Sequence, residues 1–229
     1  MNLHNYINRL FKYYNLIAFT FVICLITANL AATKLVQFGS LTVPGGIIIF
    51  PLLYVMNDIL TEVYGFSASR RVIWIALYCN LFMTLTLYLV VQLPPSDHSH
   101  THEEFTTIFA LTPKIFLASL SSYFIGELLN ASAISTLKIM LEGRNFAFRA
   151  ILSTCVGAFI ETAIFASIAF GAFLPISNLL SMIFTMTALK VAYELVVLPF
   201  TIRITNFLKK VENIDSFEKP SWRGILGWR

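Results

Sequence analysis

The sequence predicts an all-α, polytopic integral membrane protein with six transmembrane helices and both termini in the cytoplasm. Of its 229 residues, 57% are hydrophobic and only 12% are charged, whereas soluble domains carry about 25% charged residues. The mean hydropathy is +0.76. Apolar runs of about 20 residues, the length that a helix needs to cross a bilayer, recur along the whole chain. Lysine and arginine gather at alternate ends of these runs, as in multi-pass membrane proteins.

The expected spans are separated by turn-forming residues and by charged loops. They cover residues 15–37, 44–64, 70–92, 113–137, 149–174 and 178–203.

The first span starts like a secretory signal, because Arg9 and Lys12 precede an apolar run. The run continues to about Val36, which is long enough to cross the membrane, so we expect an uncleaved helix. The second span begins with Pro44-Gly45-Gly46 and contains Pro51. These residues predict either a broken helix or a simple kink at its start.

The basic residues predict the orientation, because cytoplasmic loops are enriched in lysine and arginine. On the external side, Lys114 is the one basic residue near the ends of the expected spans. This placement accounts for the net charge of +4 without a nucleic-acid partner. We expect one transmembrane domain over residues 1–210 and a short cytoplasmic tail over residues 211–229. The cytoplasmic side would hold Arg9, Lys12, Arg70, Arg71, Lys138, Arg144, Arg149, Arg203, Lys209, Lys210, Lys219, Arg223 and Arg229.

Several ionisable residues fall inside the expected spans. Each charge at a helix centre costs about 2.5–3.5 kcal/mol on insertion scales. Such groups must pair, become neutral or line a wet cavity. The acids outnumber the lysines, so pairing alone does not account for the set, which comprises Lys34, Asp58, Glu62, Glu127, Glu161, Lys190 and Glu194.

Two interpretations of these residues remain open from spacing alone. Lys190 and Glu194 are four residues apart, so they can form an ion pair on one helix face. Glu62 can pair with Arg70 or Arg71 at the membrane surface. Alternatively, the charged residues enclose a polar cavity together with amides at similar depth, namely Asn29, Asn57, Asn80 and Asn130.

Other chemistries find little support. The chain has no G-x-x-x-x-G-K-[ST] phosphate loop, so any ATP hydrolysis must come from a partner. No H-E-x-x-H or G-x-S-x-G motif is present, and we expect neither an enzyme nor a cofactor. For the histidines of the expected external loop, a solvated segment is favoured over a metal site. All histidines lie outside the spans, at His4, His98, His100 and His102.

Several motifs in order along the chain resemble the queuosine precursor transporter family, the YhhQ-like or vitamin uptake transporter group. They are Ala28-Asn29-Leu30 with Lys34, FPLLYVMNDILTEVYG, LTPKIFLASLSSYFIGELLN, STCVGAFIET and LKVAYELVVLPFT. The resemblance extends from about residue 15 to 210. The family often has aspartate where this chain has Glu161, which keeps the carboxylate and lengthens its reach.

This resemblance implies a transporter in the bacterial inner membrane. It would import 7-deazaguanine bases for queuosine modification of tRNA: 7-cyano-7-deazaguanine, 7-aminomethyl-7-deazaguanine or queuine. An alternative is a membrane-embedded binding subunit that a separate ATPase energises. Whether the chain forms a homo-oligomer is left open.

A deazaguanine presents N1–H and an exocyclic amino group side by side, and a buried carboxylate can accept both. The flat ring can stack on an aromatic side chain such as Tyr54, Phe165 or Tyr193. The substrate-binding residues expected from this chemistry are Asn29, Asp58, Asn80, Glu127, Asn130, Glu161, Lys190, Tyr193 and Glu194.

Overall fold

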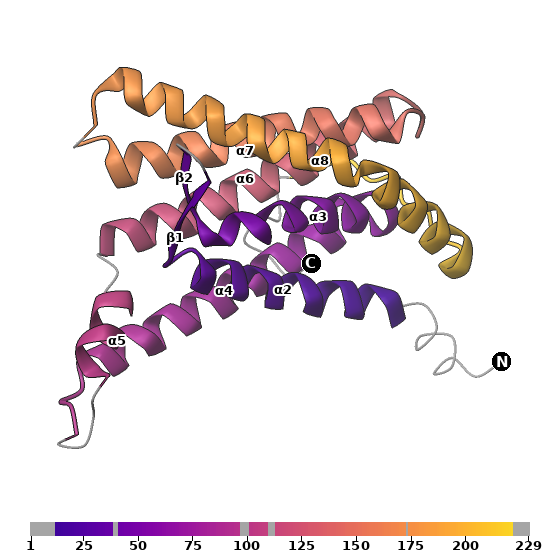
Figure 1. The fold of residues 1–229 in the computed structure, drawn as a ribbon. Coiled ribbons are helices and arrows are strands. Elements are labelled where there is room, and N and C mark those ends of the chain that lie inside the picture. The colour runs from indigo at the N-terminus through magenta and orange to yellow at the C-terminus, as the bar shows by residue number, and fades with distance from the viewer. Residues whose placement is uncertain (1–11, 39–40, 97–100, 110–112, 173, 222–229) are drawn as a thin grey trace.

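The computed structural model describes residues 12–38, 41–96, 101–109, 113–172 and 174–221 (Figure 1). Arg9, His4, His98 and His100 lie outside these ranges. The elements are α2 (Lys12–Ala31), β1 (Leu35–Phe38), β2 (Leu41–Pro44), the 3-10 turn η1 (Gly45–Ile48), α3 (Phe50–Tyr64), α4 (Phe66–Val91), α5 (His102–Phe109), α6 (Pro113–Met140), α7 (Phe146–Phe170) and α8 (Ile176–Glu212).

Helix α3 is the centre of the bundle. It contacts α2, α4, α6 and α8, and Figure 1 shows it between the α2–α4 layer and the α6–α7–α8 layer. Of its 15 residues, 12 are buried, including Asn57, Asp58 and Glu62. The polar residues of this helix are therefore enclosed by other helices and do not face the lipid.

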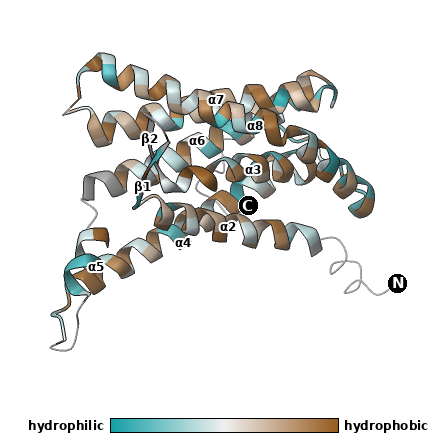
Figure 2. Cartoon of the chain, viewed as in Figure 1, coloured by the Kyte–Doolittle hydropathy of each residue, from teal (hydrophilic) through white to brown (hydrophobic). Residues whose placement is uncertain are grey.

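The structure confirms an all-α membrane protein with one small exception, a two-stranded hairpin. Among the described residues, five helical segments are long and apolar enough to cross a membrane: α2, η1 with α3, α4, α7 and α8. Hydrophobic residues run along these helices in Figure 2, and hydrophilic ones collect at α5 and at the C-terminal end of α8. Helix α6, which is 28 residues long, is not among these five segments.

The first helix ends earlier than the sequence predicts. It stops at Ala31 instead of residue 37, and the residues that follow pair as the antiparallel hairpin of β1 and β2. Lys34 consequently lies in the exposed turn before β1. Its prediction as an ionisable group inside the first span is wrong, because the helix ends before reaching it.

The start of the second segment is broken, as one reading of its Pro-Gly-Gly sequence predicts. Gly45–Ile48 forms a 3-10 turn, and α3 begins only at Phe50, with Pro51 in its first turn. The backbone carbonyl of Ala31 lies close to Gly45, where a Cβ atom would be only 2.7 Å away. The chain therefore needs glycine here to return against the end of α2.

Helices α6 and α7 pack more extensively than any other pair. Two glycines permit this approach: a Cβ atom on Gly126 would lie 2.6 Å from the Cβ of Glu161, and one on Gly157 would lie 2.9 Å from the Cβ of Asn130. Small residues at a helix interface allow backbones to come close in membranes. The contact places Asn130 and Glu161 at the same interface.

The C-terminal segment returns across one end of the bundle. Helix α8 extends to Glu212, beyond the expected end at residue 203, and the chain then reverses at Asn213 with φ 53°. The amide of Ser216 donates a hydrogen bond to the carbonyl of Val63 over 3.2 Å. Glu218 accepts hydrogen bonds from the amide and the hydroxyl of Ser67. Residues 213–221 are thus tied to the helix ends.

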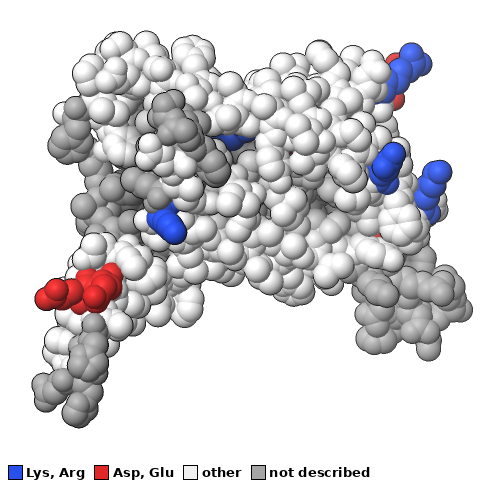
Figure 3. All heavy atoms as spheres, in the orientation of Figure 1, with Lys and Arg blue, Asp and Glu red and all other residues white. Residues whose placement is uncertain are grey.

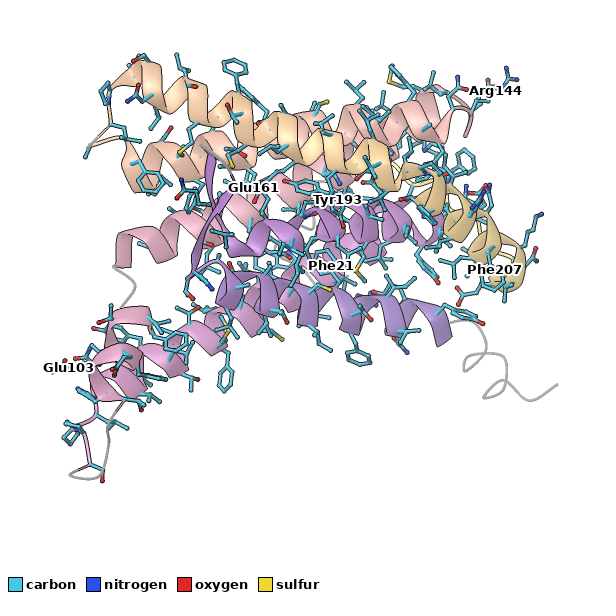
Figure 4. All side chains as sticks on the ribbon, in the orientation of Figure 1. Phe21, Glu103, Arg144, Glu161, Tyr193 and Phe207 are labelled. Carbon is cyan, nitrogen blue, oxygen red and sulfur yellow. The ribbon has the colours of Figure 1, made fainter. Side chains whose placement is uncertain are left out.

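Charge is distributed unevenly between the two ends of the molecule. Figure 3 shows several exposed lysine and arginine side chains at the end where α6 joins α7 and α8 terminates, and a group of acidic side chains over α5, with a basic side chain nearby, at the other end. Figure 4 labels Arg144 and Glu103 at these opposite ends. We call the end with the α6–α7 loop the basic end and the end with α5 and the hairpin the hairpin end.

Candidate functional site

A cavity of about 720 Å³ lies in the half of the bundle toward the hairpin end. Its size falls within the range of small-molecule sites, which measure about 300–1,000 Å³. Residues of α2, η1, α3, α4, α5, α6, α7 and α8 line it. The lining is mainly apolar, with a few polar groups that include Asn29, Asn80, Ser122, Glu161 and Lys190.

Glu161 and Lys190 form an ion pair at the cavity. The Nζ atom of Lys190 lies 2.7 Å from Oε2 of Glu161, and the two side chains retain 15% and 11% of their accessible surface. The hydroxyl of Tyr54 donates a hydrogen bond to the same oxygen. Lys190 also lies over the Tyr54 ring, 5.4 Å from its centroid. Figure 4 shows Glu161 in the interior of the bundle.

This ion pair replaces the one that spacing suggested. Lys190 bonds Glu161 on α7 and not Glu194 on its own helix. Both carboxylate oxygens of Glu194 are buried and have no hydrogen-bond partner among the described residues.

A second polar contact lies on another side of the cavity. The side-chain amide of Asn29 on α2 donates a hydrogen bond to Oδ1 of Asn80 on α4 over 3.1 Å. Both residues line the cavity. Free amide hydrogens and carbonyl lone pairs remain on such a pair for a ligand.

A buried polar layer adjoins the cavity without lining it. Asn57 on α3 donates a hydrogen bond to Oε2 of Glu127 on α6 over 2.5 Å and another to its backbone carbonyl over 3.0 Å. The hydroxyl of Ser69 completes the chain by donating to Oδ1 of Asn57. Asn130 on α6 donates to Oδ1 of Asp58 over 2.8 Å.

The structure therefore divides the predicted site residues into two groups. Asn29, Asn80, Glu161 and Lys190 line the cavity. The buried layer holds Asp58, Glu127, Asn130 and Glu194. Tyr193 is half-buried on α8 and belongs to neither group.

The basic end is closed by a cluster of charges around Glu62. This carboxylate accepts hydrogen bonds from Arg149 on α7, at 2.5 Å and 3.0 Å, and from Lys209 on α8 at 2.5 Å. The Nζ atom of Lys138 on α6 lies 3.6 Å from the same carboxylate. Asp215 of the C-terminal segment bridges Lys138 and Lys209. The cluster joins α3, α6, α7 and α8 with the segment that follows α8.

The predicted surface pairing of Glu62 with Arg70 or Arg71 is wrong. Glu62 is only 1% exposed and pairs with cations from α6, α7 and α8. Arg70 instead donates a hydrogen bond to the carbonyl of Ser221 over 3.1 Å and lies over the Phe66 ring. Sequence reasoning missed this cluster because its partners are more than 70 residues apart.

The aspartate in the cluster shows the effect of these cations. Burial on its own would raise the pKa of Asp215, but the hydrogen bonds from Lys138 and Lys209 outweigh it and hold that pKa below its usual value. Asp215 is therefore ionised near neutral pH and bound to two cations.

Comparison with known proteins identifies the family. The family model described as "Putative vitamin uptake transporter" matches residues 44–204. The chain belongs to this family. The matched range contains α3, α4, α6 and α7 in full, with the Glu161–Lys190 pair and the buried polar layer, whereas Asn29 precedes it.

Among curated proteins, the "Probable queuosine precursor transporter" of Bacillus subtilis (strain 168) is 26% identical to the chain over 176 residues. The alignment covers 76% of this chain and 77% of that protein. The comparison with solved structures gives no match. The chain is accordingly a multi-pass membrane protein of a vitamin uptake transporter family.

Proposed function

We propose that this chain imports queuosine precursors across the bacterial inner membrane, with the cavity as the base-binding site. The substrates are 7-deazaguanine bases such as 7-cyano-7-deazaguanine, 7-aminomethyl-7-deazaguanine or queuine. The observation that carries the proposal is a cavity at one end of the bundle whose polar wall is the Glu161–Lys190 pair, while the Glu62 cluster closes the other end. The name of the Bacillus subtilis relative supports the substrate class.

The chemistry of the cavity suits a deazaguanine. The Glu161 carboxylate accepts the adjacent N1–H and amino group of the base as a bidentate pair, and Lys190 balances its charge. Asn29 and Asn80 supply amide groups for the base carbonyl. Phe165 lines the same cavity and offers a ring face for stacking.

The geometry also suggests how the protein is oriented. In this proposal α6 is the sixth transmembrane span, both termini are cytoplasmic, and the basic end faces the cytoplasm. The cavity at the hairpin end then faces outward, and the Glu62 cluster is the closed inner gate. Such one-sided access to a site between helices is what an alternating-access transporter requires.

A strain that depends on an external queuosine precursor tests the proposal. We expect the wild-type chain to restore queuosine in tRNA and Glu161→Gln to fail, with the control variant Glu103→Gln on exposed α5 behaving as wild type. If Glu161→Gln transported as well as the wild type, the carboxylate site would be excluded.

Reconstitution of the purified protein alone in liposomes separates two modes of action. Uptake by the purified chain alone indicates a secondary transporter. Binding without uptake indicates a membrane-embedded binding subunit that needs a separate ATPase.

A further inference from the structure

Asp58 and Glu194 are buried acids that lie outside the base-binding cavity and outside the Glu62 cluster. Asp58 on α3 is 0% exposed, and Glu194 on α8 is 1% exposed. The two helices pack together, and the two carboxyl groups are close enough for their charges to repel each other. Neither side chain lines the cavity.

Their hydrogen bonding is incomplete. Oδ1 of Asp58 accepts a hydrogen bond from Asn130, but Oδ2 is buried and has no partner in the described part of the chain. Both carboxylate oxygens of Glu194 are also buried and have no hydrogen-bond partner among the described residues. A buried carboxylate normally accepts several hydrogen bonds when it is ionised. These oxygens have the environment of a neutral carboxyl group.

The neighbouring charges do not compensate for them. Lys190 bonds Glu161, and the cations at the basic end bond Glu62. Among the described residues, the charged groups with the largest effect on Asp58 are the acids Glu62, Glu127 and Glu194, from α3, α6 and α8. Two ionised carboxylates in this place would each carry an uncompensated charge inside the membrane, which is energetically costly. Binding one proton removes one of these charges and the repulsion with it.

We infer that Asp58 and Glu194 together hold one exchangeable proton and form a proton-binding site distinct from the base-binding cavity. The inference rests on the proposed function, because the proton is the ion that moves with the base. The proton bonds to one carboxylate oxygen of the pair when it enters from the outer side. It leaves as a free proton on the inner side, which restores the ionised pair.

The structure contains a connection between this pair and the cavity. Asn130 donates a hydrogen bond to Asp58 and packs against Gly157 of α7. A Cβ atom added to Gly157 would lie 2.9 Å from the Cβ of Asn130. Glu161 follows Gly157 by one helical turn. A shift of α7 on base binding therefore reaches the hydrogen-bond donor of Asp58. Asn130 is a positioning residue in this account.

The test uses purified full-length protein in liposomes, with labelled 7-cyano-7-deazaguanine as the probe. An inward proton gradient should drive accumulation of the base by the wild-type protein. Asp58→Asn and Glu194→Gln should reduce this accumulation to the level of protein-free liposomes and keep exchange of internal for external base. Glu142→Gln, on an exposed loop, should retain both activities.

A measurement on the wild-type protein keeps the test independent of how the variants fold. With a pH-sensitive dye inside the liposomes, addition of external base should acidify the interior. Accumulation that follows a sodium gradient, or that persists in both Asp58→Asn and Glu194→Gln, overturns the inference. If wild-type protein exchanges the base without proton movement, only the inference fails. If it neither binds nor exchanges any 7-deazaguanine, the proposed function fails with it.

Discussion

Lys190 on α8 donates a hydrogen bond to Glu161 on α7 over 2.7 Å, across a separation of 29 residues in the sequence. The pair joins two helices at the wall of the cavity and shares its oxygen with the Tyr54 hydroxyl of α3. One ion pair thereby fixes the relative positions of three helices around the proposed site.

Removing one member of this pair should destabilise the protein more than removing both. Lys190→Met leaves Glu161 without its cation, and breaking a largely buried pair in this way costs about 3–5 kcal/mol. In the double variant Lys190→Met/Glu161→Gln no uncompensated charge remains, so thermal unfolding in detergent should return toward the wild-type temperature. Equal melting temperatures for the single and double variants would contradict this coupling.

The Glu62 cluster should contribute strongly to the unfolding free energy of the protein, because it joins the helices at the basic end. Glu62→Gln leaves Arg149, Lys138 and Lys209 without their common anion, and we expect a loss of about 3–5 kcal/mol in unfolding free energy. The matched control is Glu142→Gln.

Glu142 pairs with Arg144 at 3.8 Å, and both side chains are 80% exposed. Exposed pairs contribute only about 0–1 kcal/mol, so the control should melt close to the wild type. A cluster variant that melts like this control would show that the buried charges do not hold the end closed.

The α6–α7 approach should tolerate no side chain at Gly157. Gly157→Leu places atoms where the backbone and side chain of Asn130 already lie, and overpacking of this kind costs about 1–3 kcal/mol or more. Phe159→Leu, at an exposed position of the same helix, is the control. The melting temperature of Gly157→Leu should fall, and base binding should weaken because Glu161 is displaced. Retention of both properties would mean that the helices can separate without consequence.

The attachment of the C-terminal segment should depend on pH through Asp215. Because the pKa of this residue is lowered by Lys138 and Lys209, its contribution to stability is present above its ordinary value of 3.8 and is lost as the pH falls through the lower folded value. The melting temperature of the wild type should exceed that of Asp215→Asn at pH 6. The difference should shrink below pH 3.8. A difference that stays constant with pH would rule out the ionised carboxylate as its source.

Hydropathy was sufficient to locate most of the helices but not their ends. The apolar run continues to Val36, yet Leu35–Phe38 forms a strand, because a short apolar run has the same composition in a strand and in a helix. Helix α8 continues to Glu212 because the residues after Pro199 mix apolar and polar side chains in a way that still permits an amphipathic helix outside the bilayer.

The ionisable residues were recognisable from the sequence, but their partners were not. Spacing allows Lys190 to pair with Glu194, whereas the structure pairs Lys190 with Glu161. The rotation of α8 about its axis decides this choice, and contacts with α3 and α7 set that rotation. For Glu62, the anion of the basic end, sequence position likewise suggests the nearby arginines as possible partners, but its partners come from three distant helices.

The most direct test of the central claim is uptake of labelled 7-cyano-7-deazaguanine by the purified chain in liposomes, measured for the wild type and for Glu161→Gln. We expect the wild type to show saturable uptake that unlabelled 7-aminomethyl-7-deazaguanine inhibits by competition. We expect Glu161→Gln to show no uptake. An analogue without the exocyclic amino group should compete poorly, because it lacks one of the two donors for Glu161. Equal uptake by the two proteins, or equal competition by that analogue, would contradict the assignment of the cavity as the base-binding site.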